Sequence, residues 1–289
     1  MEDFNIKVFL KNRKEYFNFR EIKYKTYKNL AKTILNNNNL DICEFLDNLI
    51  ATHSNNNFNN FNFLEKLIIL LVLRIICISP VLEFNIQDKN KKQQLISIDL
   101  TKLLEKLQNF DTEINEIQTI ENVKINFSLT SKLFLNTLEE QYLSTIQNVT
   151  VDNNTYQVDD MKILEILPTT TLKYAKDFFD KIHENLSKIF LIQISFGDSE
   201  KIELPLSLKD NTIIEFLKIL FKRDLLSLYE FEYFFISKAN LTYDLLYNST
   251  PAELNVFMNI FKKDIEDKNK QQKGNNLNLP SSNLNTHNE

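Results

Sequence analysis

The sequence predicts an α+β protein that is mostly helical, with short antiparallel hairpins and a disordered C-terminal tail. Three observations support this fold class. Apolar residues recur at helical spacing over several segments, which indicates amphipathic helices around a core. Shorter segments alternate apolar and polar residues on either side of polar turns, as antiparallel hairpins do. Residues 269–289 are polar and almost free of core-forming side chains, which is typical of disorder.

The first third of the chain predicts a hairpin followed by three helices. Phe4, Ile6 and Val8 alternate with other residues, and the polar run at residues 11–14 turns the chain into a second strand. Asp41 is expected to cap the second helix. The third helix is apolar nearly all round, so we expect it at the centre of the core. The expected helices are residues 24–35, 41–50 and 63–78, with a solvated Asn-rich loop at residues 54–62.

The middle of the chain predicts short strands separated by single helices. Val123, Ile125 and Phe127 alternate with polar residues and so share one face of a strand. Gly197 begins a Gly-Asp-Ser run that suits a tight turn. The expected strands are residues 81–86, 95–100, 123–129, 189–196 and 201–206, with a further hairpin at residues 149–158. The expected helices are residues 101–107 and 170–186 and a short helix within residues 131–160.

Residues 223–264 carry the clearest helix boundaries in the chain. Thr250 supplies a hydroxyl at an N-cap, Pro251 occupies the first helical position, and Glu253 follows three residues after the cap. Together they form a capping box. The helices expected in and beside this segment are residues 211–221, 225–237, 243–247 and 251–267. We group the elements into an N-terminal α+β domain at residues 1–130, a C-terminal α+β domain at residues 131–268, and the tail.

Composition argues against several classes of protein. The formal net charge of −5 is opposite in sign to the basic surplus of a protein that coats nucleic acid. The chain has only two glycines, Gly197 and Gly274, so the glycine-rich phosphate loops of nucleotide-binding enzymes are not expected. The apolar run at residues 67–73 is interrupted by Arg74, whereas a spanning helix needs about 20 apolar residues. We therefore expect a core helix and no membrane insertion.

We predict no catalytic, cofactor-binding or metal-binding residues. His53, His183 and His287 are scattered, and none has a second ligand at a spacing that suits a metal ion. Cys43 and Cys77 lie in apolar helical contexts, so we expect two buried, unreactive thiols and no disulfide. Pairs of neighbouring carboxylates diverge on any regular element and are expected on solvated faces.

Two features are candidates for contacts with other proteins. A guanidinium inside an apolar helix needs a partner, so Arg74 either pairs with a carboxylate or takes part in an interface. The carboxylates considered for it are Asp41, Glu65 and Glu83. The aromatic run at residues 229–235 is too dense for the buried face of one helix, so the helix is either surrounded or partly exposed to a partner. The candidate partner-binding residues are Tyr229, Phe231, Tyr233, Phe234, Phe235 and Arg74.

Two blocks of the sequence resemble the small baseplate hub and hub-assembly proteins of T4-type contractile-tailed bacteriophages. The first block comprises FNFREIKYKTYKNLAKTILNNN, DICEFLDNLI and FLEKLIILLVLRIICISPVLEFNI. The second is LLSLYEFEYFFISKANLTYDLLYNSTPAELNVFMNIFKKDIEDK, with its Thr-Pro-Ala-Glu helix start. Together they cover about the first third and the last quarter of the chain. Ser79 and Pro80 stand where the family has a glycine after the Leu-Arg helix.

The resemblance implies a non-enzymatic structural or assembly protein of the tail baseplate hub. Its partners would be other baseplate hub proteins, with no cofactor and no nucleic acid. It would be found in the host cytoplasm during assembly or in the baseplate of the virion. Two alternatives remain open at this point: a transient tail-assembly chaperone absent from the virion, and a tail-associated hydrolase. The sequence does not predict the oligomeric state.

Overall fold

The computed structural model describes residues 4–55, 61–87, 93–110, 115–120, 122–134, 137–152, 154–157, 167–189, 191–196, 200–205 and 212–275. The fold is α+β, with helices in the majority and short antiparallel sheets, as predicted. Residues 88–92 of the polar turn predicted at residues 88–94, the predicted turn at residues 197–199, and the end of the predicted tail, residues 276–289, lie outside these ranges.

The first part of the chain forms a hairpin and three helices, the third of which is buried. The elements are β1 (Ile6–Leu10), β2 (Glu15–Phe19), α1 (Tyr24–Leu35), α2 (Asn39–His53) and α3 (Phe63–Cys77). Helix α3 is buried on every side over residues 63–74, because apolar residues surround its axis and leave no polar face. It contacts α2 and β1. This confirms the predicted central helix.

The described middle of the chain forms three separate sheets and includes a long helix. A hairpin of β3 (Val81–Gln87) and β4 (Gln93–Asp99) leads into α4 (Leu100–Gln108), which packs on α3. A four-stranded antiparallel sheet follows, with α5 and α7 beside it, and then a second hairpin. These elements are β5 (Glu116–Ile120), β6 (Val123–Phe127), α5 (Leu138–Leu143), β7 (Ile146–Val151), β8 (Asn154–Gln157), α7 (Thr171–Ile189), β9 (Leu191–Phe196) and β10 (Glu200–Pro205).

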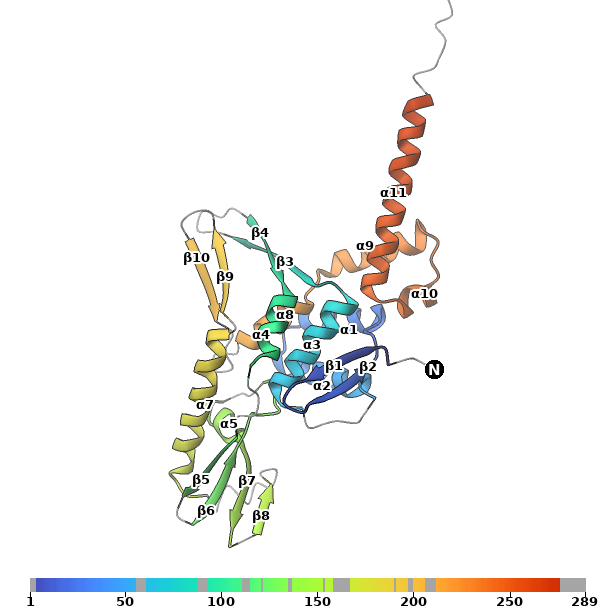
Figure 1. Ribbon diagram of the computed structural model, residues 1–289. Coiled ribbons are helices and arrows are strands. Elements are labelled where there is room, and N and C mark those ends of the chain that lie inside the picture. Colours follow the sequence, from blue (N-terminus) through green and yellow to red (C-terminus); the bar gives the residue numbers. More distant parts are fainter. Residues whose placement is uncertain are drawn as a thin grey trace, which may run out of the picture.

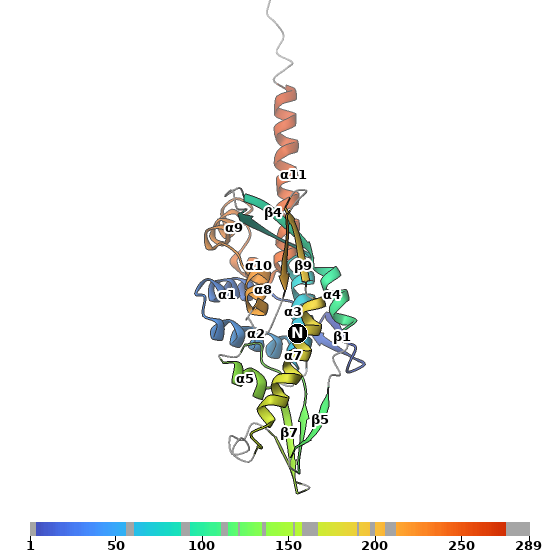
Figure 2. The same cartoon turned by 90° about the vertical axis from the view of Figure 1, so that its left-hand side faces the viewer.

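The last part of the chain consists of four helices, α8 (Thr212–Phe221), α9 (Leu225–Ser237), α10 (Tyr243–Asn248) and α11 (Pro251–Asn275). Helices α8, α9 and α10 all contact α1, and α11 contacts α3. Figures 1 and 2 show α11 projecting from one end of the molecule, opposite the end occupied by the four-stranded sheet. The C-terminal helices therefore pack directly on helices of the N-terminal part of the chain.

Several predicted details are wrong. Helix α2 begins at Asn39 and is capped by Asn38, whose side chain accepts from the Leu40 N–H at 3.0 Å, so Asp41 lies in the first turn. The loop expected to be solvated contains the buried Phe61. Strand β5 was not predicted. The tail was expected to begin at residue 269, but α11 continues through Asn275.

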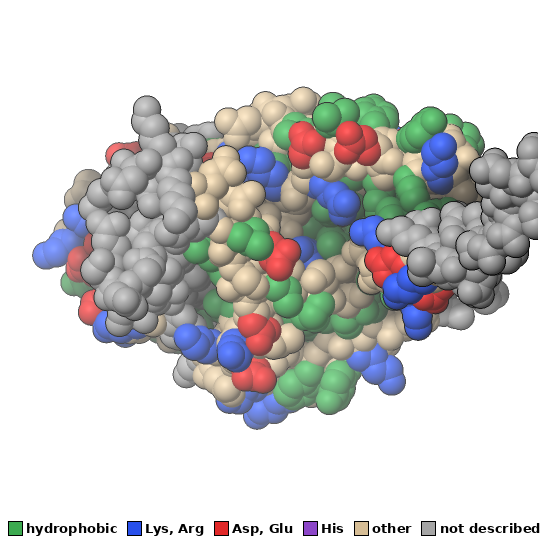
Figure 3. All heavy atoms as spheres, turned by 90° about the horizontal axis from the view of Figure 1, so that it is seen from above, with side chains coloured by type: hydrophobic (Ala, Val, Ile, Leu, Met, Phe, Trp, Pro, Cys, Tyr) green, Lys and Arg blue, Asp and Glu red, His purple; other side chains and the backbone are tan. Residues whose placement is uncertain are grey.

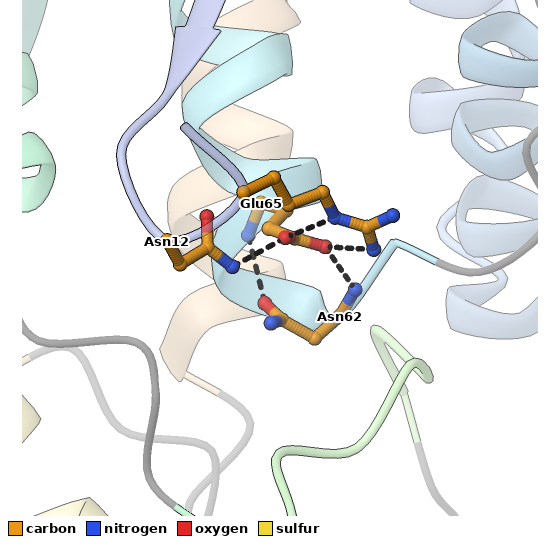
Figure 4. A network of polar contacts seen from close by, with 4 residues as sticks. Asn12, Asn62 and Glu65 are labelled. Carbon is orange, nitrogen blue, oxygen red and sulfur yellow. Dashed lines mark hydrogen bonds and ion pairs between the residues drawn. The ribbon is translucent and has the colours of Figure 1, made fainter. Parts of the chain in front are cut away.

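Glu65 anchors the first hairpin to the start of α3 (Figure 4). Its carboxylate is buried and receives two hydrogen bonds from Arg13, at 2.7 Å and 2.8 Å, and another from Asn12. Glu65 also forms a capping box with Asn62, whose N–H donates to it at 2.9 Å. The Arg13 guanidinium lies 5.1 Å from the centre of the Phe61 ring. A buried carboxylate is tolerated here because a cation and several donors surround it.

Both cysteines are buried and unpaired as disulfides, as predicted. Burial raises the pKa of the Cys43 thiol to about 12 and that of Cys77 to about 11. Cys77 also accepts a hydrogen bond from the Ile22 N–H at 3.1 Å. Because the thiolate is the reactive form, neither side chain is suited to act as a nucleophile at neutral pH.

These shifts predict how thiol reactivity and stability depend on pH. In the native protein at pH 8, we expect both thiols to react with a disulfide reagent on the order of 100-fold more slowly than in urea, because they stay protonated and covered. Since the folded pKa values lie above the value of 9.0 for an unperturbed thiol, their contribution to stability is complete below pH 9 and is lost as pH rises towards about 11 to 12. Equal labelling rates in native and unfolded protein would contradict the predicted slow reaction of the native thiols.

Candidate protein-docking surface

Tyr24, the first residue of α1, holds the C-terminal helices against the N-terminal part of the chain. Its side chain is fully buried, and its hydroxyl donates to the backbone carbonyl of Leu228 at 3.1 Å. Its ring lies 5.6 Å from that of Phe231 and is stacked on Tyr247 at 6.3 Å. Its backbone N–H donates to the Ser249 carbonyl at 2.8 Å. One side chain thus contacts both α9 and α10.

A buried ion pair makes a second link between α1 and α9. Lys28 Nζ lies 2.6 Å from Glu232 Oε1, and both side chains are almost inaccessible to solvent. The same ammonium lies 4.8 Å from the centre of the Tyr229 ring, and Lys32 Nζ lies 5.8 Å from it. Both ammonium groups therefore attract the Tyr229 ring by cation–π interaction while the residue stays exposed.

Arg74 has a structural role that differs from both predicted ones. The Arg74 side chain is buried. Its Nε donates to the Leu220 carbonyl at 2.8 Å, and a second guanidinium nitrogen donates to the Ser79 carbonyl. Leu220 belongs to the last turn of α8, where carbonyl oxygens lack partners within the helix and attract cations. The predicted pairing with Asp41, Glu65 or Glu83 is wrong. Because Arg74 is buried, its side chain is not available as a surface contact.

Burial lowers the pKa of Arg74, but a guanidinium keeps its proton at neutral pH. Its charge is offset by the carbonyl dipoles of α8 and of the segment that follows α3. Arg74 thereby joins the central helix to the chain segment that leads into α9.

The aromatic run on α9 is divided between core and surface. Phe231 and Phe235 are buried, and their rings contact each other at 4.7 Å. Phe234 is half-buried, with its ring 5.0 Å from that of Phe261 on α11. Tyr229 and Tyr233 remain 48% and 62% exposed. Of the predicted partner-binding residues, the two tyrosines therefore lie at the surface, whereas Phe231 and Phe235 serve the core.

The exposed side of α9 is extended by a residue that the sequence analysis did not single out. Leu226 is 65% exposed and lies three residues before Tyr229, which in turn lies four residues before Tyr233. This spacing places the three side chains on one face of the helix. We call Leu226, Tyr229 and Tyr233 the α9 stripe. The helical period could have identified Leu226, but the period alone does not say which face is buried.

Further apolar side chains are exposed on α10 and α11. Seen from the end from which α11 projects, hydrophobic side chains reach the surface next to the base of that helix (Figure 3). A monomer rarely exposes a large apolar area without a binding role. The exposed large apolar residues of these two helices are Tyr243, Leu245, Val256, Phe257, Ile260 and Ile265.

Two cavities are lined by residues outside α9, α10 and α11. One of about 330 Å³ is lined by residues of the first hairpin, α1 and α2, including Arg20, Glu21, Lys23 and His53. The other, of about 280 Å³, is lined by Asp47 and Lys66 among others. The groups whose pKa values burial raises, Tyr24, Tyr27, Cys43 and Cys77, do not line either cavity.

Over the described ranges, no group of three or more His, Cys, Asp or Glu side chains could hold a metal ion. His53 Nδ1 lies 2.9 Å from the Leu49 carbonyl at the end of α2, His183 lies within α7, and His287 is outside the described residues. The helices that the structure describes are each too short or too polar to cross a lipid bilayer.

The geometry of the C-terminal helices defines a candidate protein-binding surface on an α+β scaffold. Comparisons of the chain with protein-family models, with curated proteins and with solved structures found no match.

Proposed function

We propose that this protein is a non-enzymatic structural or assembly protein of a phage tail baseplate hub, acting through protein–protein contacts. The observation that carries the contact mechanism is the exposed α9 stripe, Leu226, Tyr229 and Tyr233, on a helix whose other side is anchored in the core. The setting rests on the resemblance of two sequence blocks to baseplate hub proteins. The partners are accordingly other hub subunits.

The stripe suits a binding role for energetic reasons. Tyrosine is enriched among residues that dominate binding energy, because its ring buries a large area and its hydroxyl tolerates water at the rim. The two lysines beside Tyr229 hold its ring in place before a partner arrives. A side chain that is already ordered loses less conformational entropy on binding.

The test is co-purification with hub proteins from infected cells, using the double substitution Tyr229→Ala and Tyr233→Ala. Truncation of a hot-spot residue costs about 2 kcal/mol or more, so we expect at least roughly a 100-fold loss of affinity for the hub partner. The variant should unfold in urea close to the wild type, since both tyrosines are exposed. Phe234 is left intact because it packs on Phe261.

Tyr174→Ala is the matched control, since Tyr174 is an exposed tyrosine on helix α7 and not part of the α9 stripe. It should leave co-purification unchanged. Equal capture of hub proteins by wild type and the double variant would refute the contact mechanism. Mass spectrometry of purified particles then distinguishes a virion component from an assembly factor that leaves before completion.

A further inference from the structure

Helix α11 carries apolar side chains on two opposite sides. The inner side, Leu254, Met258 and Phe261, packs on the body of the protein: Leu254 is buried, Met258 is half-buried against the core, and the Phe261 ring lies 5.0 Å from that of Phe234 on α9. The outer side consists of Val256 and Ile260, which are 58% and 61% exposed, and Phe257, which is 44% exposed, lies between the two sides. At 3.6 residues per turn, Val256 and Ile260 lie roughly opposite Leu254. A helix that is apolar on two sides usually packs on both.

The outer side has the spacing of a coiled-coil seam. Glu253, Val256, Ile260 and Lys263 follow one another at intervals of three, four and three residues, which places them on one line along the helix. Glu253 and Lys263 are both exposed. The seam therefore has two apolar positions in the middle, an acid at one end and a base at the other.

From this pattern we infer that a second copy of the chain covers the outer side of α11, with the two α11 helices antiparallel. In that arrangement Val256 of each copy faces Ile260 of the other, and Glu253 faces Lys263. In a parallel pair the same seam would place glutamate against glutamate and lysine against lysine. Opposite charges at such positions select orientation, and like charges disfavour it.

The shape of the molecule leaves room for this pairing. Helix α11 projects from the body (Figures 1 and 2), and its described side chains beyond Phe261, residues 262–268 and 270, are all exposed. Glu253 uses one carboxylate oxygen to accept from the Thr250 N–H at 2.6 Å, and a carboxylate has further acceptor positions for a lysine. The α9 stripe is separate from the seam, so self-pairing and hub binding do not require the same side chains.

The first test is the mass in solution by light scattering after size-exclusion chromatography. The seam spans about three turns, and small interfaces are weak, so the protein should be measured at about 100 µM. We expect the wild type to approach twice the chain mass of 34.2 kDa. Ile260→Asp should weaken the pairing at least roughly 100-fold and give the single-chain mass, and Lys263→Glu should weaken it about tenfold.

Ile117→Asp is the matched control, because Ile117 is 56% exposed and lies on strand β5. It should leave the dimer intact. A wild type that keeps the mass of one chain would overturn the inference, even if a different partner covers the seam. A dimer that survives Ile260→Asp would overturn it as well.

Cysteine cross-linking tests the antiparallel register. A mixture of Val256→Cys and Ile260→Cys chains should form interchain disulfides faster than either variant alone, because these two positions face each other only across the pair. Native Cys43 and Cys77 are buried and contribute little background. Equal cross-linking in the single variants would exclude this register.

Discussion

Replacing Glu65 with alanine is expected to destabilise the fold by about 3 kcal/mol, because it leaves the Arg13 guanidinium and several N–H groups without their acceptor. Glu65 is buried, caps α3, and receives hydrogen bonds from Asn12, Arg13 and Asn62. The hairpin of β1 and β2 should lose its attachment to α3 first. Urea unfolding followed by circular dichroism measures the effect.

Two further variants separate the contributions at Glu65. Glu65→Gln keeps an acceptor oxygen but removes the charge, so its loss of stability should be smaller than that of Glu65→Ala. Glu184→Ala removes an exposed ion pair with Lys188 on α7 and should change the unfolding free energy by about 0.5 kcal/mol or less. If Glu65→Ala is no more destabilising than Glu184→Ala, the network does not stabilise the fold.

Tyr24→Ala should release the C-terminal helices from the rest of the molecule. A large buried side chain replaced by alanine costs about 3–5 kcal/mol, and this ring packs between Phe231 and Tyr247. Burial also raises the pKa of the Tyr24 hydroxyl, which therefore remains protonated and able to donate to the Leu228 carbonyl. We expect earlier unfolding in urea and faster proteolysis within residues 238–250.

Tyr24→Phe is the control that removes only the hydroxyl. It should cost about 1 kcal/mol, the usual net contribution of one hydrogen bond, and leave proteolysis nearly unchanged. Equal stability of Tyr24→Ala and Tyr24→Phe would mean that the ring does not hold α9 and α10 in place.

The helix bounds that were predicted correctly depend on local features of the chain. Residues 24–35 and 225–237 were predicted as helices with the bounds that the structure gives. The Thr250–Glu253 capping box is also present, with hydrogen bonds of 2.6 Å and 3.2 Å. Each of these features depends on residues a few positions apart, where helical spacing and cap chemistry act directly.

The wrong predictions concern positions where two residues could play the same role, or where the local sequence pattern is weak. Asn38 and Asp41 can both cap a helix, and the sequence does not show which one adopts the extended backbone of an N-cap. The predicted end of α11 relied on the loss of apolar residues after Ile265. Lysine, glutamine and glutamate form helices without a core, and Lys268 pairs with Asp264 at 2.7 Å within this helix.

The sequence by itself determined most helices and strands, the central position of α3, and the buried state of both cysteines, because hydrophobic period and composition encode them locally. Only the tertiary structure decided which side of each helix meets another element. Tyr24 and Lys28 reach partners 204 residues away, and Arg74 donates to a carbonyl of α8 and to the Ser79 carbonyl rather than to a carboxylate. The same long-range packing covers Phe231 and Phe235 and leaves Tyr229 and Tyr233 exposed. A helix can bury only the side that another element meets, and no local pattern states which side that will be.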